Sequence, residues 1–188
     1  MANLGLPDKE SFKFYSSVVK REKMNHNISI IVAVDKNNGI GRNGDQLAYI
    51  SGDLKRFKAL TTGHTIVMGR KTFEALPKGA LPNRRNVVIT RRHDYHPAGC
   101  DVYNSIKDVM EEADSNEELF VIGGGEIYNA FLPYADKIYL TVIDNKFDGV
   151  DTFFPEIKED EWKAVEKEGP LVDDKSGLTY RYITLIRR

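Results

Sequence analysis

Apolar runs separated by polar segments dominate the chain. The continuous apolar, β-branched run at residues 28–34 (ISIIVAV) is typical of a strand that is buried on both faces. Similar runs predict further strands at residues 65–69, 86–90, 101–104, 119–122 and 137–143. Apolar residues at helical spacing predict helices at residues 51–60, 70–76, 105–113 and 126–132. This alternation favours one α/β domain whose mostly parallel sheet is covered by helices on both faces.

The two ends of the chain differ from this middle part. Two long strands, around residues 161–169 and 178–188, are separated by Pro170 and Gly177 and indicate an antiparallel edge of the sheet. Residues 1–27 are mostly polar and charged, apart from a few apolar positions at the spacing of a short surface helix. We therefore treat residues 1–27 as an N-terminal extension, native or added, and residues 28–188 as the domain.

Composition excludes several classes of protein. The formal net charge of the 188 residues is -1, which argues against a nucleic-acid partner or an anionic membrane surface. No apolar run is long enough to span a bilayer, and the N-terminus lacks the apolar segment of a secretory signal. A single cysteine, Cys100, rules out an internal disulfide. We expect a cytoplasmic protein, and since no feature demands a dimer, a monomer.

Residues 39–44 (GIGRNG) fit the G-x-G-x-x-G pattern of dinucleotide-binding proteins, but the match is interpreted as false. That fingerprint needs its third glycine at the opening of a helix, and the predicted helix begins only at Ser51, whose hydroxyl is expected to cap it. The segment is therefore expected to be a flexible loop beyond the first strand, where a loop can still cover a ligand.

Two segments between a strand and a helix are suited to an anion. Gly123-Gly124-Gly125 would present backbone N–H groups without side chains in the way, which favours phosphate, although a tight packing turn is the alternative. In Gly69-Arg70-Lys71-Thr72, two cations open a helix whose dipole is already positive there, which indicates a bound anion unless the pair is simply solvated.

A third basic segment, Arg91-Arg92, follows the strand predicted at residues 86–90. Ligands of open α/β sheets bind beyond the carboxyl ends of the strands, so the three segments together indicate a phosphate-bearing ligand. His93 and His96 have no nearby carboxylate or thiol to complete a metal site and are interpreted as surface residues. No metal is expected.

Asp53 and Phe57 lie four residues apart and therefore share one face of the predicted helix. Asp53 either favours the helix dipole or lies in an apolar pocket, where its carboxylate would pair with the amide or cationic edge of a ligand. Spacing alone leaves both alternatives open.

Six segments, taken together, resemble the dihydrofolate reductases in that family's order and at about its spacing. They are ISIIVAVDKNNGIG, DLKRFK, IVMGRKTFEAL, LPNRRNVVIT, FVIGGGEIYNAFLPYADKIYLT and DTFFP. The resemblance covers the chain from residue 28 to its end. It implies a central eight-stranded, mostly parallel sheet with four helices. It also implies reduction of 7,8-dihydrofolate to tetrahydrofolate by NADPH, with hydride transfer to pterin C6 and protonation at N5.

The resemblance implies roles in substrate binding. Asp53 matches the acid that bonds the pterin 2-amino group and N3, and Thr141 matches the threonine that holds both; these two are the implied catalytic residues. Arg84 matches the arginine that pairs with the α-carboxylate of the glutamate tail. The other implied substrate-binding residues are Ile31, Val32, Leu54, Phe57 and Ile122. Antifolate inhibitors are expected at the same pocket.

The resemblance also implies an NADPH site. Tyr128 would form a wall of the nicotinamide pocket, Gly123 and Gly124 match a pair joined by a cis peptide, and Arg91 and Arg92 lie where the 2′-phosphate is bound. The full implied set is Ala33, Ile40, Gly41, Gly69, Arg70, Lys71, Thr72, Thr90, Arg91, Arg92, Ile122, Gly123, Gly124, Gly125, Glu126, Ile127 and Tyr128. The loop from Gly39 to about Leu47 matches the family's mobile lid.

One departure from the family pattern stands before the active-site helix. Gln46-Leu47-Ala48 replaces the usual Leu/Met-Pro-Trp, and Ser51 replaces the usual proline. A paralogue that binds pterin or nucleotide without turnover is therefore one alternative. The NADPH-dependent reductase of riboflavin synthesis, which shares the fold, is another, but it has no need for both Asp53 and Arg84.

Overall fold

The structure is a computed structural model that describes residues 27–114 and 116–188. The predicted extension, with its expected short helix, lies outside the described residues except for Asn27, which is the first residue of strand β1. No helix in the described part of the chain is long and apolar enough to cross a membrane.

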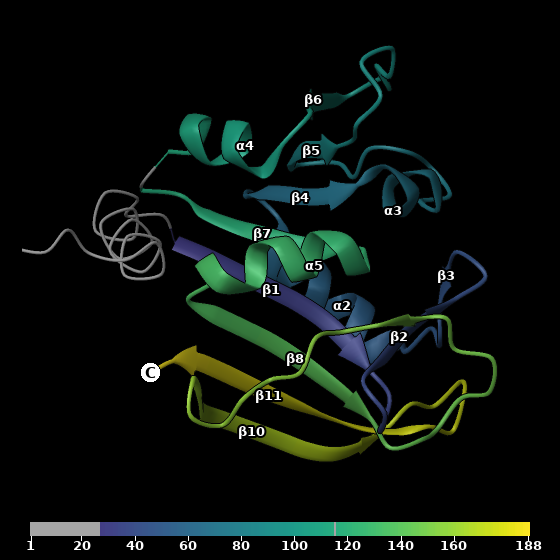
Figure 1. The fold of residues 1–188 in the computed structure, drawn as a ribbon. Helices are drawn as coiled ribbons and strands as arrows, with labels where there is room; N and C mark the ends of the chain where they lie inside the picture. The colour runs from purple at the N-terminus through teal and green to yellow at the C-terminus, as the bar shows by residue number, and fades with distance from the viewer. Residues whose placement is uncertain (1–26, 115) are drawn as a thin grey trace, which may run out of the picture.

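An eight-stranded sheet forms the centre of the molecule (Figure 1). Its strands, in spatial order, are β10 (Trp162–Val172), β11 (Thr179–Arg187), β8 (Lys137–Ile143), β1 (Asn27–Val34), β7 (Glu118–Gly123), β4 (Thr65–Gly69), β5 (Arg85–Ile89) and β6 (Cys100–Tyr103). The six strands from β8 to β6 run parallel, and β11 pairs antiparallel with both β8 and β10. The predicted parallel sheet with an antiparallel edge is confirmed.

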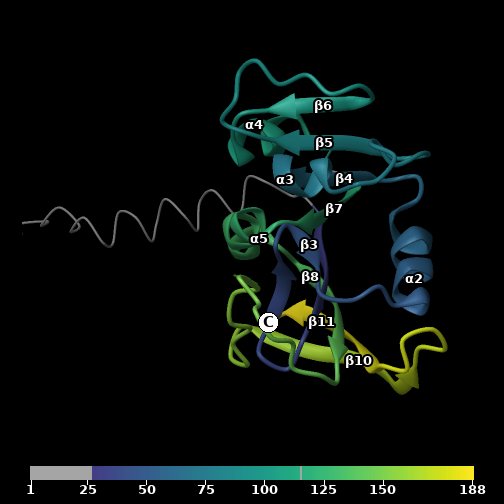
Figure 2. The same cartoon turned by 90° about the vertical axis from the view of Figure 1, so that its right-hand side faces the viewer.

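Four α-helices of the described residues cover the sheet, with α2 on one side of it and α5 on the other (Figure 2). They are α2 (Ser51–Thr61), α3 (Arg70–Glu74), α4 (Ile106–Glu112) and α5 (Gly125–Phe131), and a 3₁₀ turn, η1 (Leu132–Tyr134), follows the last. Because successive strand residues point to opposite faces, each central strand contributes to two cores. Ile30 packs with Tyr128 and Phe131 of α5, whereas its neighbour Ile31 packs in the cluster that contains Phe73 of α3.

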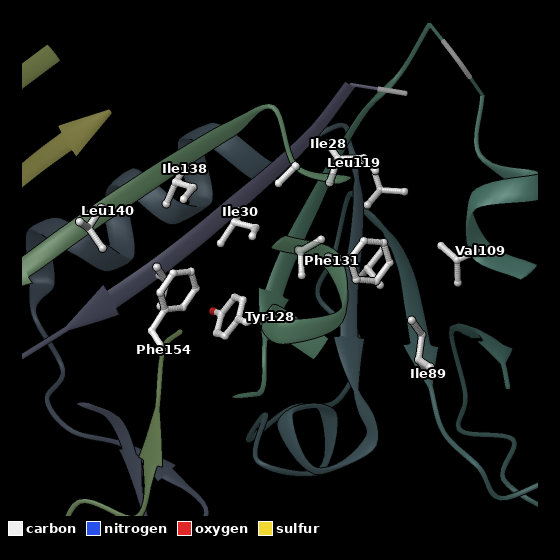
Figure 3. Packing of buried hydrophobic residues seen from close by; sticks show 14 of the residues in the cluster. Ile28, Ile30, Ile89, Val109, Leu119, Tyr128, Phe131, Ile138, Leu140 and Phe154 are labelled. Atoms are coloured by element: carbon white, nitrogen blue, oxygen red, sulfur yellow. The ribbon is translucent and has the colours of Figure 1, made fainter. Parts of the chain in front are cut away.

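The larger core lies between the sheet and helices α4 and α5 (Figure 3). Ile30, Phe131 and Ile138 are fully buried there, and Phe154 closes the cluster next to Tyr128, with ring centroids 5.1 Å apart. This core makes the central strands a rigid support. The carboxyl ends of the parallel strands therefore present their loops from fixed positions.

The glycine-rich segment differs from its prediction. It forms strand β2 (Gly39–Arg42), which pairs with β3 (Asp45–Gln46) and β9 (Thr152–Phe153) in a small second sheet, rather than a loop without structure. Asn43 and Gly44 have φ angles of 54° and 80°. Two adjacent residues with positive φ make the tight hairpin turn that an Asn-Gly pair favours, so this hairpin was readable from the sequence. As predicted, no helix opens at Gly44.

Of the two predicted helix caps, one is confirmed and one is wrong. The predicted cap of α4 is confirmed, because Ser105 Oγ accepts the Asp108 backbone N–H at 3.2 Å. The predicted Ser51 cap is wrong: Ile50 takes the N-cap position, and Ser51 is the first helical residue. Its backbone N–H is instead satisfied by Asp173 Oδ1 at 2.8 Å, from the turn between β10 and β11.

Candidate active site

A carboxylate and a hydroxyl meet between helix α2 and the sheet. Thr141 Oγ1 donates to Asp53 Oδ1 at 2.5 Å, and Thr141 is only 2 % exposed. Strand alternation decides this contact, since Leu140 packs in the α5-side core while Thr141 faces α2. Burial raises the pKa of Asp53 above its usual value, and the Thr141 hydrogen bond and the positive charge of Arg56 oppose that rise. The site thus holds one oriented, partly desolvated carboxyl group.

An aromatic ring and a cation follow this acid along the same side of the sheet. The Arg84 guanidinium carbon lies 5.9 Å from the centroid of the half-buried Phe57 ring. Arg84 also donates to Thr61 Oγ1 at 3.1 Å and to the carbonyl oxygen of Pro82 at 3.0 Å, which fixes the side chain. An acid, an apolar wall and a fixed cation in this order suit a ligand with a polar amide edge, an apolar body and an anionic end.

The strand ends beside this acid supply a largely apolar wall. Ile31 and Ile122 are half-buried and pack in one cluster, and Ala33 lies half-buried near the cluster that contains Ile50. Val32 is 6 % exposed and its side chain packs in the α5-side core, so only its backbone can face a ligand beside this acid. Leu54 of α2 is 46 % exposed. Thus a flat apolar ligand would find side chains on the sheet side and on the helix side.

Tyr128 ties helix α5 to strand β1. Its hydroxyl donates to the Ile31 carbonyl oxygen at 2.8 Å, and burial raises the pKa of this phenol far above its usual value, so that it stays a donor. This hydrogen bond fixes Ile31 relative to helix α5.

The glycine turn between β7 and α5 lies against the start of α3. The Gly123–Gly124 peptide is cis, as the resemblance implied. A Cβ on Gly124 would lie 3.2 Å from Thr72 Oγ1, and one on Gly69 would lie 3.1 Å from Ile127 Cγ1. Side chains at these positions would crowd the cradle between α3 and α5, whereas glycines leave the backbone open to a bulky anionic ligand.

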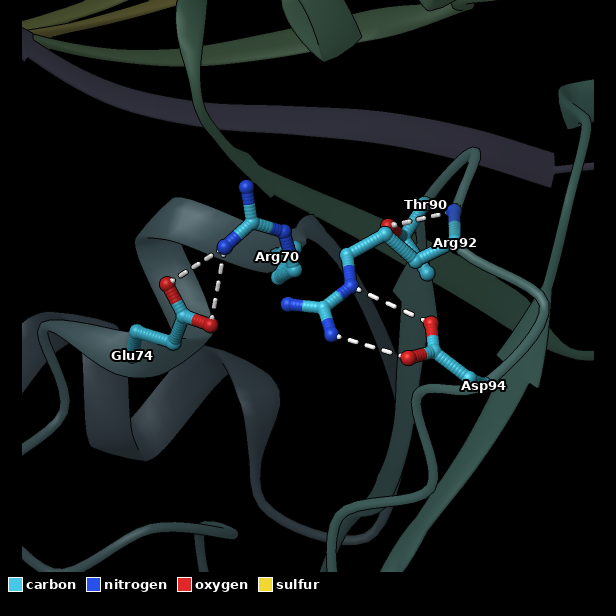
Figure 4. Close-up of polar contacts among 5 residues, drawn as sticks. All are labelled: Arg70, Glu74, Thr90, Arg92 and Asp94. Carbon is cyan, nitrogen blue, oxygen red and sulfur yellow. Dashed lines mark hydrogen bonds and ion pairs between the residues drawn. The ribbon is translucent and has the colours of Figure 1, made fainter.

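Basic side chains surround this cradle, and several have carboxylate partners (Figure 4). Arg70 pairs with Glu74 at 2.9 Å, and Arg92 pairs with Asp94 at 3.0 Å. Arg91 reaches Glu126 only at 3.9 Å, and its side chain is 93 % exposed. Arg91 is therefore freer than Arg92 to bind a further anion.

The ends of strands β5 and β6 support this basic loop. Thr90 is 8 % exposed, its Oγ1 accepts the Arg92 backbone N–H at 3.2 Å, and its carbonyl accepts Asn104 Nδ2 at 2.7 Å. Lys71 is exposed on α3. Among the described residues, no group of three or more His, Cys, Asp and Glu side chains is placed to hold a metal ion.

The β2–β3 hairpin places Ile40 and Gly41 near the glycine turn, since β2 pairs with β9 and a Cβ on Gly125 would lie 3.0 Å from Thr152 of β9.

Tyr49, which follows Ala48, is 55 % exposed and donates to Asp45 Oδ1 at 2.7 Å. Its ring is therefore turned toward the hairpin. Ala48 itself packs near a cluster of Ile50, Ile143, Tyr180 and Tyr182.

Three residues near the acid were not identified from the sequence. Arg56 is three positions after Asp53 on α2, a spacing that already predicts a shared helix face. Tyr182 of β11 and Asp173 of the turn before β11 have no local signal, because they reach α2 only through the sheet order.

Comparisons with known proteins agree on one family. A family model described as "Dihydrofolate reductase" matches residues 27–187. The dihydrofolate reductase of Bacillus subtilis (strain 168) is 44% identical over 156 residues, which are 83% of this chain and 92% of that protein. Dihydrofolate reductase type 3 of Salmonella typhimurium is 38% identical over 161 residues, 86% of this chain and 98% of that protein.

A solved structure shows the same likeness in three dimensions. The dihydrofolate reductase from Enterococcus faecalis, complexed with NADP(H) and RAB-propyl, matches with a TM-score of 0.79 and 36% identity. The match covers 88% of this chain and 98% of that one.

Proposed function

Because this chain belongs to the dihydrofolate reductase family, we propose that its Asp53–Thr141 pair orients the pterin for reduction. The protein is an NADPH-dependent oxidoreductase that reduces 7,8-dihydrofolate to tetrahydrofolate. The observation that carries the assignment of roles is the 2.5 Å hydrogen bond from Thr141 Oγ1 to the partly buried Asp53 carboxylate. An oriented acid of this kind is what the amide-like edge of a pterin needs.

The substrate is proposed to lie along the path from Asp53 to Arg84. Asp53 accepts hydrogen bonds from the pterin 2-amino group and N3, and Phe57 covers the middle of the molecule. Arg84, held by Thr61, pairs with the α-carboxylate of the glutamate tail. The remaining residues proposed to contact the substrate are Ile31, Leu54 and Ile122, and Val32 through its backbone. Antifolates are proposed to occupy the same space, by analogy with the Enterococcus faecalis complex that holds RAB-propyl.

The cofactor is proposed to lie across the glycine turn. The open backbone at Gly124 against Thr72, with exposed basic side chains around it, fits a dinucleotide with several phosphates. Arg91 is the main candidate for the 2′-phosphate, because it is 93 % exposed and weakly paired. The other proposed contacts are Ala33, Ile40, Gly41, Gly69, Arg70, Lys71, Thr90, Arg92, Ile122, Gly123, Gly125, Glu126, Ile127 and Tyr128.

The chemistry divides between cofactor and protein. When bound, NADPH supplies the hydride that pterin C6 accepts. Asp53 fixes the pterin ring and, as an anion, favours the protonated form of the substrate, so that water can deliver the proton to N5. Tyr128 and the apolar residues around Ile31 keep the pocket rigid and largely dry.

The decisive experiment follows NADPH absorbance with dihydrofolate for the wild type and for Asp53→Asn. We expect the substitution to slow the reaction by about 10²–10⁴ and to leave NADPH affinity nearly unchanged. Glu111→Gln, which removes an exposed carboxylate of α4, is the matched control. Near-normal turnover in Asp53→Asn would show that Asp53 only stabilises helix α2 through its dipole and has no role in the reaction.

The oligomeric state and the cellular location of the enzyme are part of the same proposal. The monomeric state stays a prediction from the sequence. The cytoplasmic location and the lack of a nucleic-acid partner stay predictions from the sequence.

A further inference from the structure

Arg56 occupies an unusual place behind the acid. Its guanidinium carbon lies 4.2 Å from the centroid of the Tyr182 ring and 5.6 Å from that of Tyr139. Nη1 is buried and has no hydrogen-bond partner among the described residues. Burying an unpaired charged donor is costly, so an arginine that served only for packing could be replaced by an apolar side chain with a gain in stability. This cost points to a role for the charge.

The groups that face Asp53 and Arg56 come from three neighbouring elements. Thr141 and Tyr139 lie on β8, Tyr180 and Tyr182 on β11, and Tyr128 on α5. All five are hydroxyl side chains, which carry no charge at neutral pH.

Two other cations lie on that side of the sheet, Arg84 beside the Phe57 ring and Lys137 on β8. Lys137 donates to Tyr139 Oη at 3.2 Å and pairs with Glu118 at 3.6 Å. Arg56 is the cation that shares a helix face with Asp53, three residues after it, and its charge acts on that carboxyl group.

We propose that Arg56 is a positioning residue, whose guanidinium, stacked on Tyr182, keeps the Asp53 carboxylate ionised for its contact with the pterin. A partly buried carboxylate favours its neutral form, and a fixed cation nearby offsets that tendency. The aromatic face keeps the planar guanidinium in place at a distance that a flexible ammonium group would not hold as well. This inference rests on the role proposed above for Asp53.

The direction of the Asp53 pKa agrees with this arrangement. Burial raises the pKa of Asp53, while the Thr141 hydrogen bond and then the charge of Arg56 lower it. Removing the charge of Arg56 while keeping its stem should therefore let the pKa of Asp53 rise further.

The test is a carboxyl ¹³C NMR titration of Asp53 in the free protein, for Arg56→Met, Arg56→Lys and the control Lys55→Met. Lys55 is exposed on the same helix, so its loss removes an equal charge that solvent screens. We expect Arg56→Met to raise the pKa of Asp53 by about one unit, Arg56→Lys by less, and Lys55→Met hardly at all. Arg56→Gln replaces Arg56→Met as the neutral variant if circular dichroism shows that the methionine variant does not fold.

A second readout is the pH profile of kcat/KM for dihydrofolate. We expect the limb that reports Asp53 ionisation to move upward with the NMR value, while the Kd for NADPH stays the same. An Asp53 pKa that moves no more in the neutral variant than in Lys55→Met overturns the inference. A shifted NMR pKa with an unmoved kinetic profile would instead overturn the proposed role of Asp53 and leave the electrostatic coupling intact.

Discussion

Asp173 Oδ1 accepts the backbone N–H of Ser51 at 2.8 Å, across 122 residues of sequence. The other oxygen of Asp173 accepts the backbone N–H of Ser176 at 2.8 Å and its hydroxyl at 2.7 Å. A turn near the C-terminus therefore anchors the first residue of the helix that carries Asp53. The position of the acid depends on this distant cap.

Asp173→Asn should destabilise the protein at neutral pH. Hydrogen bonds from Ser176 and Ser51 lower the pKa of Asp173 from 3.8 to about 2. Because the pKa of Asp173 is lower in the folded protein, this carboxylate contributes stability that is present above pH 3.8 and is lost as the pH falls through about 2. We expect a lower Tm at pH 7 for the variant, and a difference from the wild type that shrinks as pH falls through this window. Thermal melts of Asp174→Asn, an exposed neighbour, give the control.

Asp53→Asn should have the opposite effect on stability. The pKa of Asp53 is raised in the folded state, mainly by burial. The contribution of Asp53 to stability is fully present below the pKa that this group has in the unfolded chain. It is lost as the pH rises through the pKa of Asp53 in the folded protein. At pH 7 the neutral asparagine should therefore raise the Tm, although turnover falls by about 10²–10⁴. A lower Tm at pH 7 would mean that the Asp53 charge stabilises the fold.

Arg91→Ala should weaken NADPH binding far more than NADH binding. Only NADPH carries the 2′-phosphate. Of the two adjacent arginines, Arg91 has the longer ion pair, 3.9 Å against 3.0 Å for Arg92. We expect KM for NADPH to rise by about tenfold, as for the loss of one charge-assisted contact, with KM for NADH almost constant. Arg92→Ala, which first breaks an ion pair with Asp94, should have the smaller effect. Equal losses for both cofactors in Arg91→Ala would reject the 2′-phosphate assignment.

Gly52→Ala should force helix α2 or Tyr180 to move. A Cβ on Gly52 would lie 2.2 Å from Tyr180 Oη, and Tyr180 is only 5 % exposed. We expect a cost of about 1–3 kcal/mol in the free energy of unfolding, measured in urea, as for overpacking of a core. The double variant Gly52→Ala/Tyr180→Phe should recover most of this loss, because it removes the clashing oxygen. If the double variant is as unstable as the single one, this close contact is not the cause.

Local patterns were sufficient for much of the fold. The bounds of β4 and β8 agree with the apolar runs, and Ser105 caps α4 as its spacing with Asp108 predicts. These features depend on residues within a few positions of one another, where periodicity and capping act directly. The Asn43-Gly44 turn preference is also local, although we expected a flexible loop there and not the hairpin that forms.

The site shows where local reasoning stops. Asp53 was a candidate from its position beside Phe57, and the family resemblance supplied the rest of its proposed role. Its hydrogen bond to Thr141, the cap from Asp173 and the stacking of Arg56 on Tyr182 join residues that lie far apart along the chain. These contacts arise because β8 and β11 pair side by side beneath α2. The sequence alone thus determined which side chains were available, while the order of strands in the sheet decided which of them met, since hydrogen bonds and charge interactions act only at short range.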